Sequence, residues 1–181
     1  MMADCQGRLT GKPGICFVTR GPGATNASAG VHIAMQDSVP MILFIGQVAS
    51  HAKEREAFQE VDYVRFFGDI AKWVVEIDDA SRIPEFVTRA FAVATSGRPG
   101  PVVMSLPEDM LTSEVEAPEA LPYAPVETRR GEAELDALEK GLGNARRPFV
   151  ILGGTRWDED AVARMRTIAE TWSLPVGCSF R

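Results

Sequence analysis

The sequence predicts an α/β protein whose mostly parallel sheet is flanked by helices in three layers, as in flavodoxin-like or Rossmann-like domains. The first observation is a series of continuous apolar runs, which are typical of strands buried on both faces. The second is that helical patterns alternate with these runs, and the third is the glycine or proline found at their ends. The predicted strands are residues 14–19, 40–46, 71–77 and 101–107.

Helices are predicted between these strands from their boundaries and their apolar spacing. We expect a helix from Pro22 onward, because proline is favoured in a first helical turn and small residues follow it. The clearest helix is residues 81–96, where apolar residues recur at intervals of three and four. Asp79 or Ser81 can cap its start, and Gly97 ends it before the fourth strand.

A change of composition separates two regions of the chain. Residues 113–131 contain three prolines and four glutamates with little periodicity, so we expect a semi-extended linker there. Residues 1–112 then form one domain, and residues 132–181 begin a second α/β domain. Both are expected to be incomplete. A single strand–helix–strand piece buries less than a usual domain of at least about 50 residues.

Composition excludes several classes of protein. The 181 residues carry 19 Lys and Arg against 25 Asp and Glu, a formal charge of −6, which argues against nucleic acid as a partner. Three cysteines without paired spacing and two histidines predict no metal site from side chains alone. The longest apolar stretch is far shorter than the ~20 residues that span a membrane. No apolar signal core is found near the N-terminus, so we expect a cytoplasmic protein.

The turn "RGPGATN", residues 20–26, follows a strand and opens a helix, so Gly21 and Gly23 allow a ligand to approach the backbone. A dinucleotide-binding loop requires glycine where Asn26 stands, and a P-loop requires a lysine that is not found here. A third interpretation is a loop that holds a flat heterocycle against Pro22, with the Asn26 amide as donor and acceptor. A turn without a ligand is the fourth, and the turn alone leaves all four open.

Three stretches of the sequence together resemble one family. They are "GKPGICFVTRGPGATNASAGVHIAMQDSVPMILFIGQV", "EAFQEVD" and "ATSGRPGPVVMSLPEDM", and they are similar to thiamine diphosphate-dependent enzymes of the acetolactate synthase type. The resemblance covers residues 7–112 and continues more weakly to the end. It implies that this domain binds the aminopyrimidine half of thiamine diphosphate, while a separate domain of the neighbouring subunit holds the diphosphate through Mg²⁺.

The same resemblance implies an activity and a set of residues. The activity is decarboxylation of a pyruvate-like 2-oxo acid and ligation of the product to a second carbonyl, in branched-chain amino acid biosynthesis, by a homodimer or homotetramer. Phe58 would form an apolar wall for the substrate, although core packing is its alternative, and the Gln59 amide would lie near the reacting carbonyl. Arg98 would contact FAD, or be a solvated loop cation. The residues implied to line the cofactor cleft are Pro22, Gly23, Asn26, Gly46 and Gln47.

Two motifs of that family are not found in this sequence. The glutamate that bonds a pyrimidine ring nitrogen belongs upstream of the matching segment, and Asp4 falls in the helix that follows it. The G-D-G diphosphate motif is also not found, since "FFGDIAK" at 66–72 resembles it only superficially. We therefore expect a piece of a longer enzyme that is inactive by itself. A benzoylformate decarboxylase-like 2-oxo-acid decarboxylase and a non-catalytic degenerate subunit are the alternatives.

Overall fold

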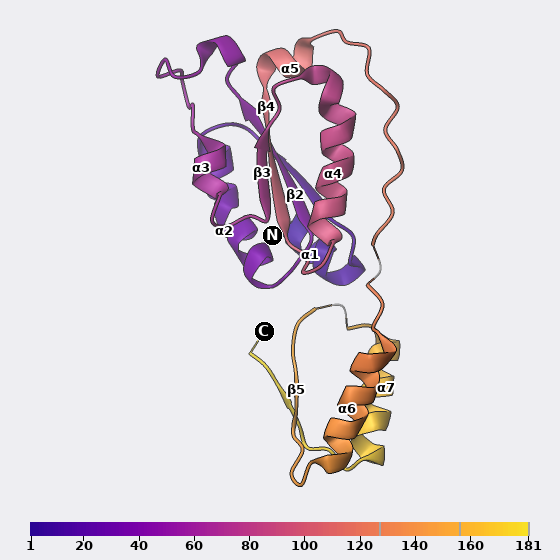
Figure 1. Ribbon diagram of the computed structural model, residues 1–181. Coiled ribbons are helices and arrows are strands. Elements are labelled where there is room, and N and C mark those ends of the chain that lie inside the picture. The colour runs from indigo at the N-terminus through magenta and orange to yellow at the C-terminus, as the bar shows by residue number, and fades with distance from the viewer. Residues whose placement is uncertain (127, 156, 181) are drawn as a thin grey trace. The chain divides into compact units, whose positions relative to one another are not determined.

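The computed structural model describes residues 1–126, 128–155 and 157–180. The chain divides into two compact units, Met1–Val126 and Glu127–Arg181. The first unit contains a four-stranded sheet with helices on both faces, and the second contains a two-stranded sheet with two helices (Figure 1). The predicted α/β class is therefore confirmed.

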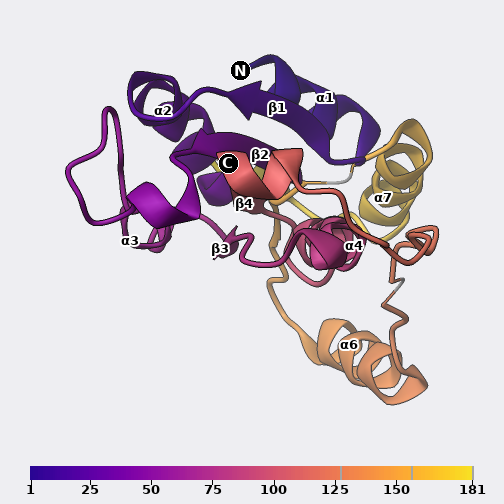
Figure 2. The same cartoon turned by 90° about the horizontal axis from the view of Figure 1, so that it is seen from above.

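The sheet of the first unit is parallel throughout. Its strands lie in the order β1-β2-β4-β3 (Figure 2). All four apolar runs predicted as strands form strands, although the third is shorter than the predicted residues 71–77. The strands are β1 (Gly14–Val18), β2 (Met41–Gln47), β3 (Trp73–Glu76) and β4 (Pro101–Pro107).

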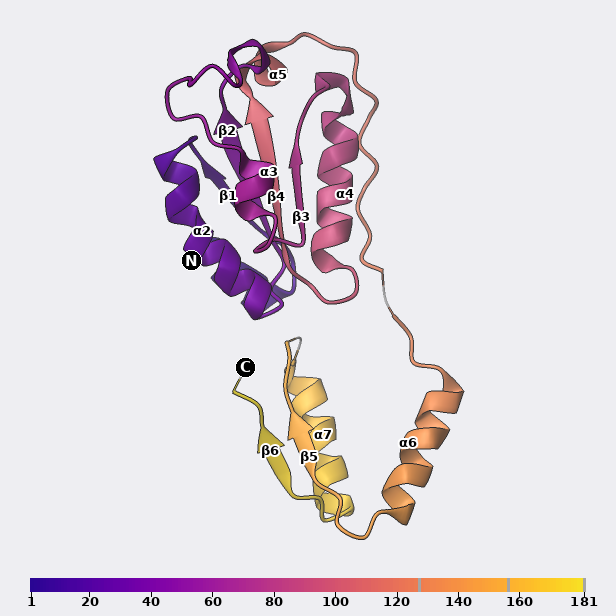
Figure 3. The same ribbon diagram turned by 60° about the vertical axis from the view of Figure 1, so that its left-hand side comes forward.

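Helices cover both faces of this sheet, as Figure 3 shows, with α2 and α3 on one face and α4 on the other. The helix predicted from Pro22 is confirmed as α2, with proline in its first turn. The helix predicted over 81–96 begins at Ile83, after the 3-10 turn Ala80–Arg82, whose start Asp79 caps. The helices are α1 (Met2–Thr10), α2 (Pro22–Gln36), α3 (Tyr63–Phe67), α4 (Ile83–Thr95) and α5 (Glu108–Thr112).

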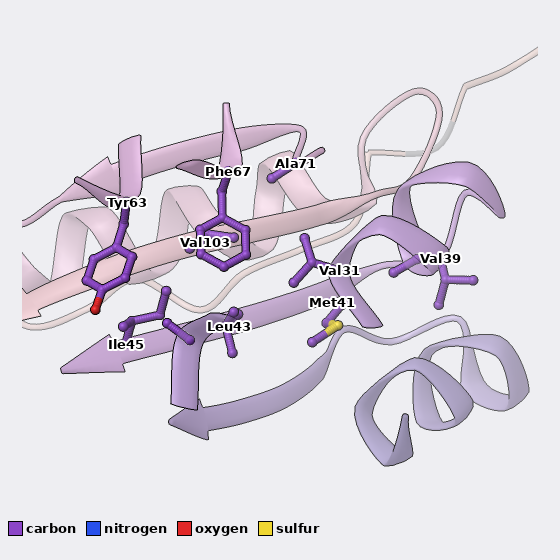
Figure 4. Packing of buried hydrophobic residues seen from close by; sticks show 11 residues of the cluster. Val31, Val39, Met41, Leu43, Ile45, Tyr63, Phe67, Ala71 and Val103 are labelled. Carbon is purple, nitrogen blue, oxygen red and sulfur yellow. The ribbon is translucent and has the colours of Figure 1, made fainter. Parts of the chain in front are cut away.

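Two apolar clusters hold these layers together, one on each face of the sheet. Successive side chains of a strand point to opposite faces, so Leu43 and Ile45 of β2 face α2 and α3, while Ile42 and Phe44 face α4. In the first cluster Tyr63 lies near Ile45 at one end and Val39 lies at the other (Figure 4). Since β2 is buried on both faces, the continuous apolar run in the sequence is explained.

The predicted linker has no regular secondary structure in its described residues, and part of it contacts the first unit. The Thr88 hydroxyl donates to the Leu121 carbonyl oxygen. Tyr123 bonds the Thr95 hydroxyl and places its ring 5.6 Å from that of Phe91. Residues 121–123 therefore lie along α4, on the face of the sheet opposite α2.

The second unit contains two strands that pair in parallel. Val150 pairs with Val176, and Leu152 pairs with Cys178. Among the residues that the structure describes, no helix is long and apolar enough to cross a membrane. The elements of this unit are α6 (Glu132–Asn144), β5 (Val150–Leu152), α7 (Glu159–Thr171) and β6 (Val176–Cys178).

Candidate functional site

Three segments meet where the parallel strands of the first unit end. The glycine turn follows β1, residues 48–62 follow β2, and α5 follows β4. We call residues 48–62 the edge loop. Arg20 of the turn forms an ion pair with Glu108 at the start of α5, and Ser50 donates through its N–H and hydroxyl to Asp109, at 2.9 and 3.2 Å. In open α/β sheets, ligands usually bind beside the carboxyl ends of the strands.

The backbone at Gly21 has a conformation that only glycine adopts readily, with φ 57° and ψ −114°. A Cβ atom built on Gly21 would lie 2.7 Å from the Cβ of Gln59 and 3.2 Å from its carbonyl oxygen. A Cβ on Gly23 would lie 2.8 Å from the Thr19 methyl carbon. Both glycines are therefore required by close packing, and Gly21 directly contacts a predicted site residue.

Several backbone groups at the start of α2 are not available as amide donors to a phosphate. Pro22 has no N–H, the Gly21 N–H donates to the Tyr63 hydroxyl at 2.7 Å, and the Thr25 N–H donates to the Gly21 carbonyl at 3.0 Å. Pro22 and Asn26 are both exposed and stand four residues apart, so they share one face of the helix. An apolar ring and an amide side chain are therefore presented together at the start of α2.

The edge loop contains three non-glycine residues in the left-handed backbone region. They are Glu54, Glu56 and Gln59, with φ of 60°, 54° and 64°. The Glu60 carboxylate stabilises this course of the chain, because it accepts the N–H of Glu54 at 2.7 Å and that of Ala57 at 3.3 Å. Such conformations persist where neighbouring contacts fix them and are concentrated at functional sites.

Gln47 anchors the end of the edge loop. Its side chain is 1% exposed, and its Nε2 donates to the Val61 carbonyl at 2.8 Å and to Glu76 at 3.4 Å. The Gln47 Oε1 accepts the Val48 N–H at 3.0 Å. Gln47 therefore binds the protein itself.

The Glu76 carboxylate joins Gln47 to the start of the edge loop. It accepts the Ser105 hydroxyl at 3.2 Å and forms an ion pair with Lys53. This contact with Glu76 raises the pKa of Lys53 above its usual value, so the lysine stays charged at neutral pH. At α5, the Ser50 N–H holds the pKa of Asp109 below its usual value, which keeps that anchor of the loop ionised as well.

The other predicted site residues near the strand ends are Gly46, Phe58 and Gln59, and they do not all face the same side. Gly46 lies on the α4 face with Phe44, whereas Gln47 lies on the opposite face with Ile45, so the two do not face the same side. Phe58 is 78% exposed on the edge loop. Gln59, next to it, contacts Gly21. The structure thus brings together the turn and Gln59, with Phe58 on the outer surface of the loop.

Arg98 lies at the other end of the strands, shortly before β4 begins at Pro101. Its Nε donates to the Ser38 hydroxyl at 2.7 Å, and its Nη2 donates to the carbonyls of Met35 and Gln36 at 3.1 and 3.0 Å. These carbonyls belong to the last turn of α2, where a cation is favoured by the helix dipole. In this structure Arg98 therefore caps a helix and is not near the glycine turn.

Replacing Arg98 by alanine is expected to lower the free energy of unfolding by about 1 kcal/mol, because the last carbonyls of α2 lose a charged donor. Arg98→Lys should restore only part of this loss, since lysine lacks the planar fork. Urea denaturation measures both, with Lys12→Ala as the exposed-cation control. An unchanged unfolding transition combined with weaker binding of FAD would instead support the flavin contact that the resemblance implies.

Sequence reasoning missed four groups that build this site, namely Tyr63, Lys53, Glu76 and Asp109. Lys53 lies on the edge loop, Glu76 ends β3 and Asp109 lies in the first turn of α5, and the partners of all three are far away in the sequence. Glu76 had one usable signal, because it is an acid at the end of an otherwise apolar strand. Within the described residues, no group of three or more His, Cys, Asp and Glu side chains is placed to hold a metal ion.

Comparison with known proteins identifies a family that the first part of the chain resembles. Residues 1–66 match the family described as thiamine pyrophosphate enzyme, N-terminal TPP binding domain. This match covers α1, the glycine turn, α2, β2 and the edge loop. Over these residues the chain is similar to the N-terminal domain of thiamine pyrophosphate enzymes.

The curated relatives narrow this class further. The chain is 36% identical over 185 residues to the acetolactate synthase isozyme 3 large subunit of Escherichia coli, covering 98% of the chain and 32% of that protein. It is 35% identical to the mitochondrial acetolactate synthase of Schizosaccharomyces pombe, over 98% of the chain and 28% of that protein. It is 36% identical to the acetolactate synthase large subunit of Lactococcus lactis, over 96% of the chain and 31% of that protein. The predicted resemblance to the acetolactate synthase type is confirmed, and the chain spans about a third of the length of these relatives.

Proposed function

We propose that this chain forms the aminopyrimidine-binding side of a thiamine diphosphate site in a 2-oxo-acid carboligase of the acetolactate synthase type. The observation that carries the proposal is the contact between Gly21 of the turn and Gln59 of the edge loop. This contact brings together the glycine turn "RGPGATN" and the segment "EAFQEVD", two of the stretches that resemble the family. The names of the relatives and the family match of residues 1–66 support the same assignment.

The residues of the turn suit the pyrimidine half of the cofactor. Pro22 offers an apolar surface, and the Asn26 amide offers both a donor and an acceptor on the same face of α2. On the α4 face of the sheet, nothing lies within 4 Å of a Cβ built on Gly46, so that side of the β2 end is open. Thiamine diphosphate, when bound, supplies the electron sink that decarboxylation of a 2-oxo acid requires.

The edge loop would act on the substrate. Gln59 would orient a carbonyl oxygen through its amide N–H groups, and the exposed ring of Phe58 would exclude water beside it. Mg²⁺, FAD and assembly as a homodimer or homotetramer are part of the proposal, as is a cytoplasmic location. A flavin contact by Arg98 would have to replace the three hydrogen bonds that this side chain makes with α2 and Ser38.

A chimera tests the proposal. The 181 residues replace the matching segment of the E. coli isozyme 3 large subunit, and acetolactate is measured with pyruvate, thiamine diphosphate, Mg²⁺ and FAD. We expect acetolactate to form. Asn26→Ala should raise the thiamine diphosphate concentration needed for half-maximal rate about tenfold, and Gln59→Ala should lower kcat. Gln6→Ala, an exposed change on α1, is the control.

Two outcomes would contradict this assignment. Release of CO₂ without acetolactate would indicate a decarboxylase. A folded chimera that binds thiamine diphosphate and releases no CO₂ would indicate a non-catalytic subunit. If Asn26→Ala and Gln6→Ala have the same effect, the turn does not bind the cofactor.

A further inference from the structure

A single hydroxyl group connects the apolar core to the glycine turn. Tyr63 is the first residue of α3, and its side chain is 0% exposed within the cluster that α2 and β2 form. Its hydroxyl accepts the Gly21 N–H at 2.7 Å. Gly21 is itself buried, so this N–H has no access to bulk water and needs a partner inside the protein.

The residues on either side of Gly21 come from one short segment. Gln59 packs against the α-carbon of Gly21, where even a methyl group would be too close, while the Tyr63 hydroxyl holds the amide of the same residue. Between them, the Val61 carbonyl is bonded by Gln47 and Asp62 caps α3 by accepting the Arg65 N–H. Residues 59–63 are thus fixed to the sheet at their centre and hold Gly21 from both ends.

We propose that Tyr63 is a positioning residue of this site, whose hydroxyl fixes the Gly21 peptide and thereby the direction in which the turn presents Pro22 and Asn26. The inference rests on the proposed function for the identity of the ligand, an aminopyrimidine. It assigns no contact between Tyr63 and that ligand. The tyrosine acts through Gly21, because the peptide that it holds leads directly into the first turn of α2.

The hydroxyl, rather than the ring, carries this role. Phenylalanine would fill the same volume in the core, so packing alone does not require an oxygen here. Removing the oxygen leaves a buried N–H unpaired, which is more unfavourable than losing a hydrogen bond at the surface. Burial raises the pKa of the Tyr63 phenol above its usual value, so the hydroxyl keeps its proton, with a lone pair for Gly21, over the physiological range.

The sequence supplies a matched control. It contains two tyrosines, and the second, Tyr123, also bonds another residue through its hydroxyl, that of Thr95, and also packs on an aromatic ring, that of Phe91. Tyr123 lies along α4, on the other face of the sheet. Tyr63→Phe and Tyr123→Phe therefore remove equivalent atoms, but only the first touches the turn.

The experiment uses the full 181-residue chain labelled with ¹⁵N, titrated with 4-amino-5-hydroxymethyl-2-methylpyrimidine as the probe. In Tyr63→Phe we expect the Gly21 amide proton to shift upfield and to exchange faster, while the Leu43 amide in the core keeps its protection. The dissociation constant of the probe should rise about three- to tenfold. In Tyr123→Phe the Gly21 amide and the dissociation constant should stay within about twofold of the parent chain.

Each other outcome decides one of the two proposals. An unchanged Gly21 amide in Tyr63→Phe, or an equal rise of the dissociation constant in both variants, overturns the positioning role. A shifted Gly21 amide with unchanged probe affinity also overturns it, because the turn would then be held without consequence for the ligand. If the parent chain does not bind the probe at all, the proposed function fails. The chemical shift and exchange rate of the Gly21 amide proton in Tyr63→Phe then decide whether Tyr63 fixes the turn.

Discussion

Gly21→Ala is expected to lower the free energy of unfolding of the first unit by about 2–5 kcal/mol. Two effects add. At φ 57° and ψ −114° an L-residue is strained, and the new methyl group would meet the Cβ of Gln59 at 2.7 Å. Because Gln59 belongs to a loop fixed at Val61 and Asp62, it has little freedom to move away. Hydrogen exchange of the β2 amides in urea measures the change.

Gly11→Ala is the matched control for this prediction. Gly11 also has a positive φ, 67°, but nothing lies within 4 Å of its Cβ position, so only the backbone conformation is penalised, by about 1 kcal/mol. The difference between the two variants isolates the contact with Gln59. Equal losses of stability in both would show that the turn and the edge loop do not contact each other as described.

Gln47→Glu is expected to be the second large change, with a loss of about 3–5 kcal/mol at pH 8. A carboxylate would replace the amide that donates to the Val61 carbonyl, and it would face Glu76, whose oxygen lies 3.4 Å from Gln47 Nε2. Burial and this like charge should raise the pKa of the introduced carboxyl above ~4.3. The loss should therefore shrink as the pH falls through that raised pKa, since the protonated acid can again donate to Val61.

Urea denaturation at pH 8 and pH 5 measures this difference, always relative to the parent chain at the same pH. Gln6→Glu, on the exposed surface of α1, adds the same charge without burying it and should change the stability by less than about 0.5 kcal/mol. A loss that is equal at both pH values would mean that the new carboxyl is solvated, and that Gln47 does not anchor the edge loop.

The strands of this fold could be predicted because their signal is local. A parallel strand buried on both faces is a continuous apolar run, and residues 40–46 and 101–107 are too short for a usual helix and begin with a proline. The start of α2 was equally clear, because Pro22 marks it. The third strand was predicted slightly too long: only Trp73–Glu76 is paired in the register with β4, although Lys72 and Ile77 on either side still donate their N–H groups to β4 carbonyls.

The site could be predicted only in part, because its geometry depends on distant contacts. The pattern of the turn indicated that Gly21 needs an unusual backbone, but it did not show that Gln59 is the neighbour that excludes a side chain. Gln47 was assigned to the cofactor cleft, yet its amide is engaged by Val61, Val48 and Glu76. Nothing in the local sequence distinguishes a glutamine that binds its own chain from one that faces a ligand.

Tyr63 was missed for the same reason. An aromatic residue after "AFQEVD" has the pattern of a core residue, and its ring does pack in the core. Only its hydroxyl, 42 positions from Gly21 along the chain, takes part in the site. A hydrogen bond of this kind leaves no periodicity, no spacing and no composition signal, so a three-dimensional structure is required to find it.

The left-handed backbone of Gln59 has a consequence for how this site can diversify. Since φ is 64° at this position, the direction in which the side chain leaves the main chain is set by the backbone of the loop. β-Branched residues are excluded by the same angle, whereas asparagine, aspartate or glycine could replace the glutamine with little rearrangement. The side chain at this position can therefore change among these residues while the backbone of the edge loop stays the same.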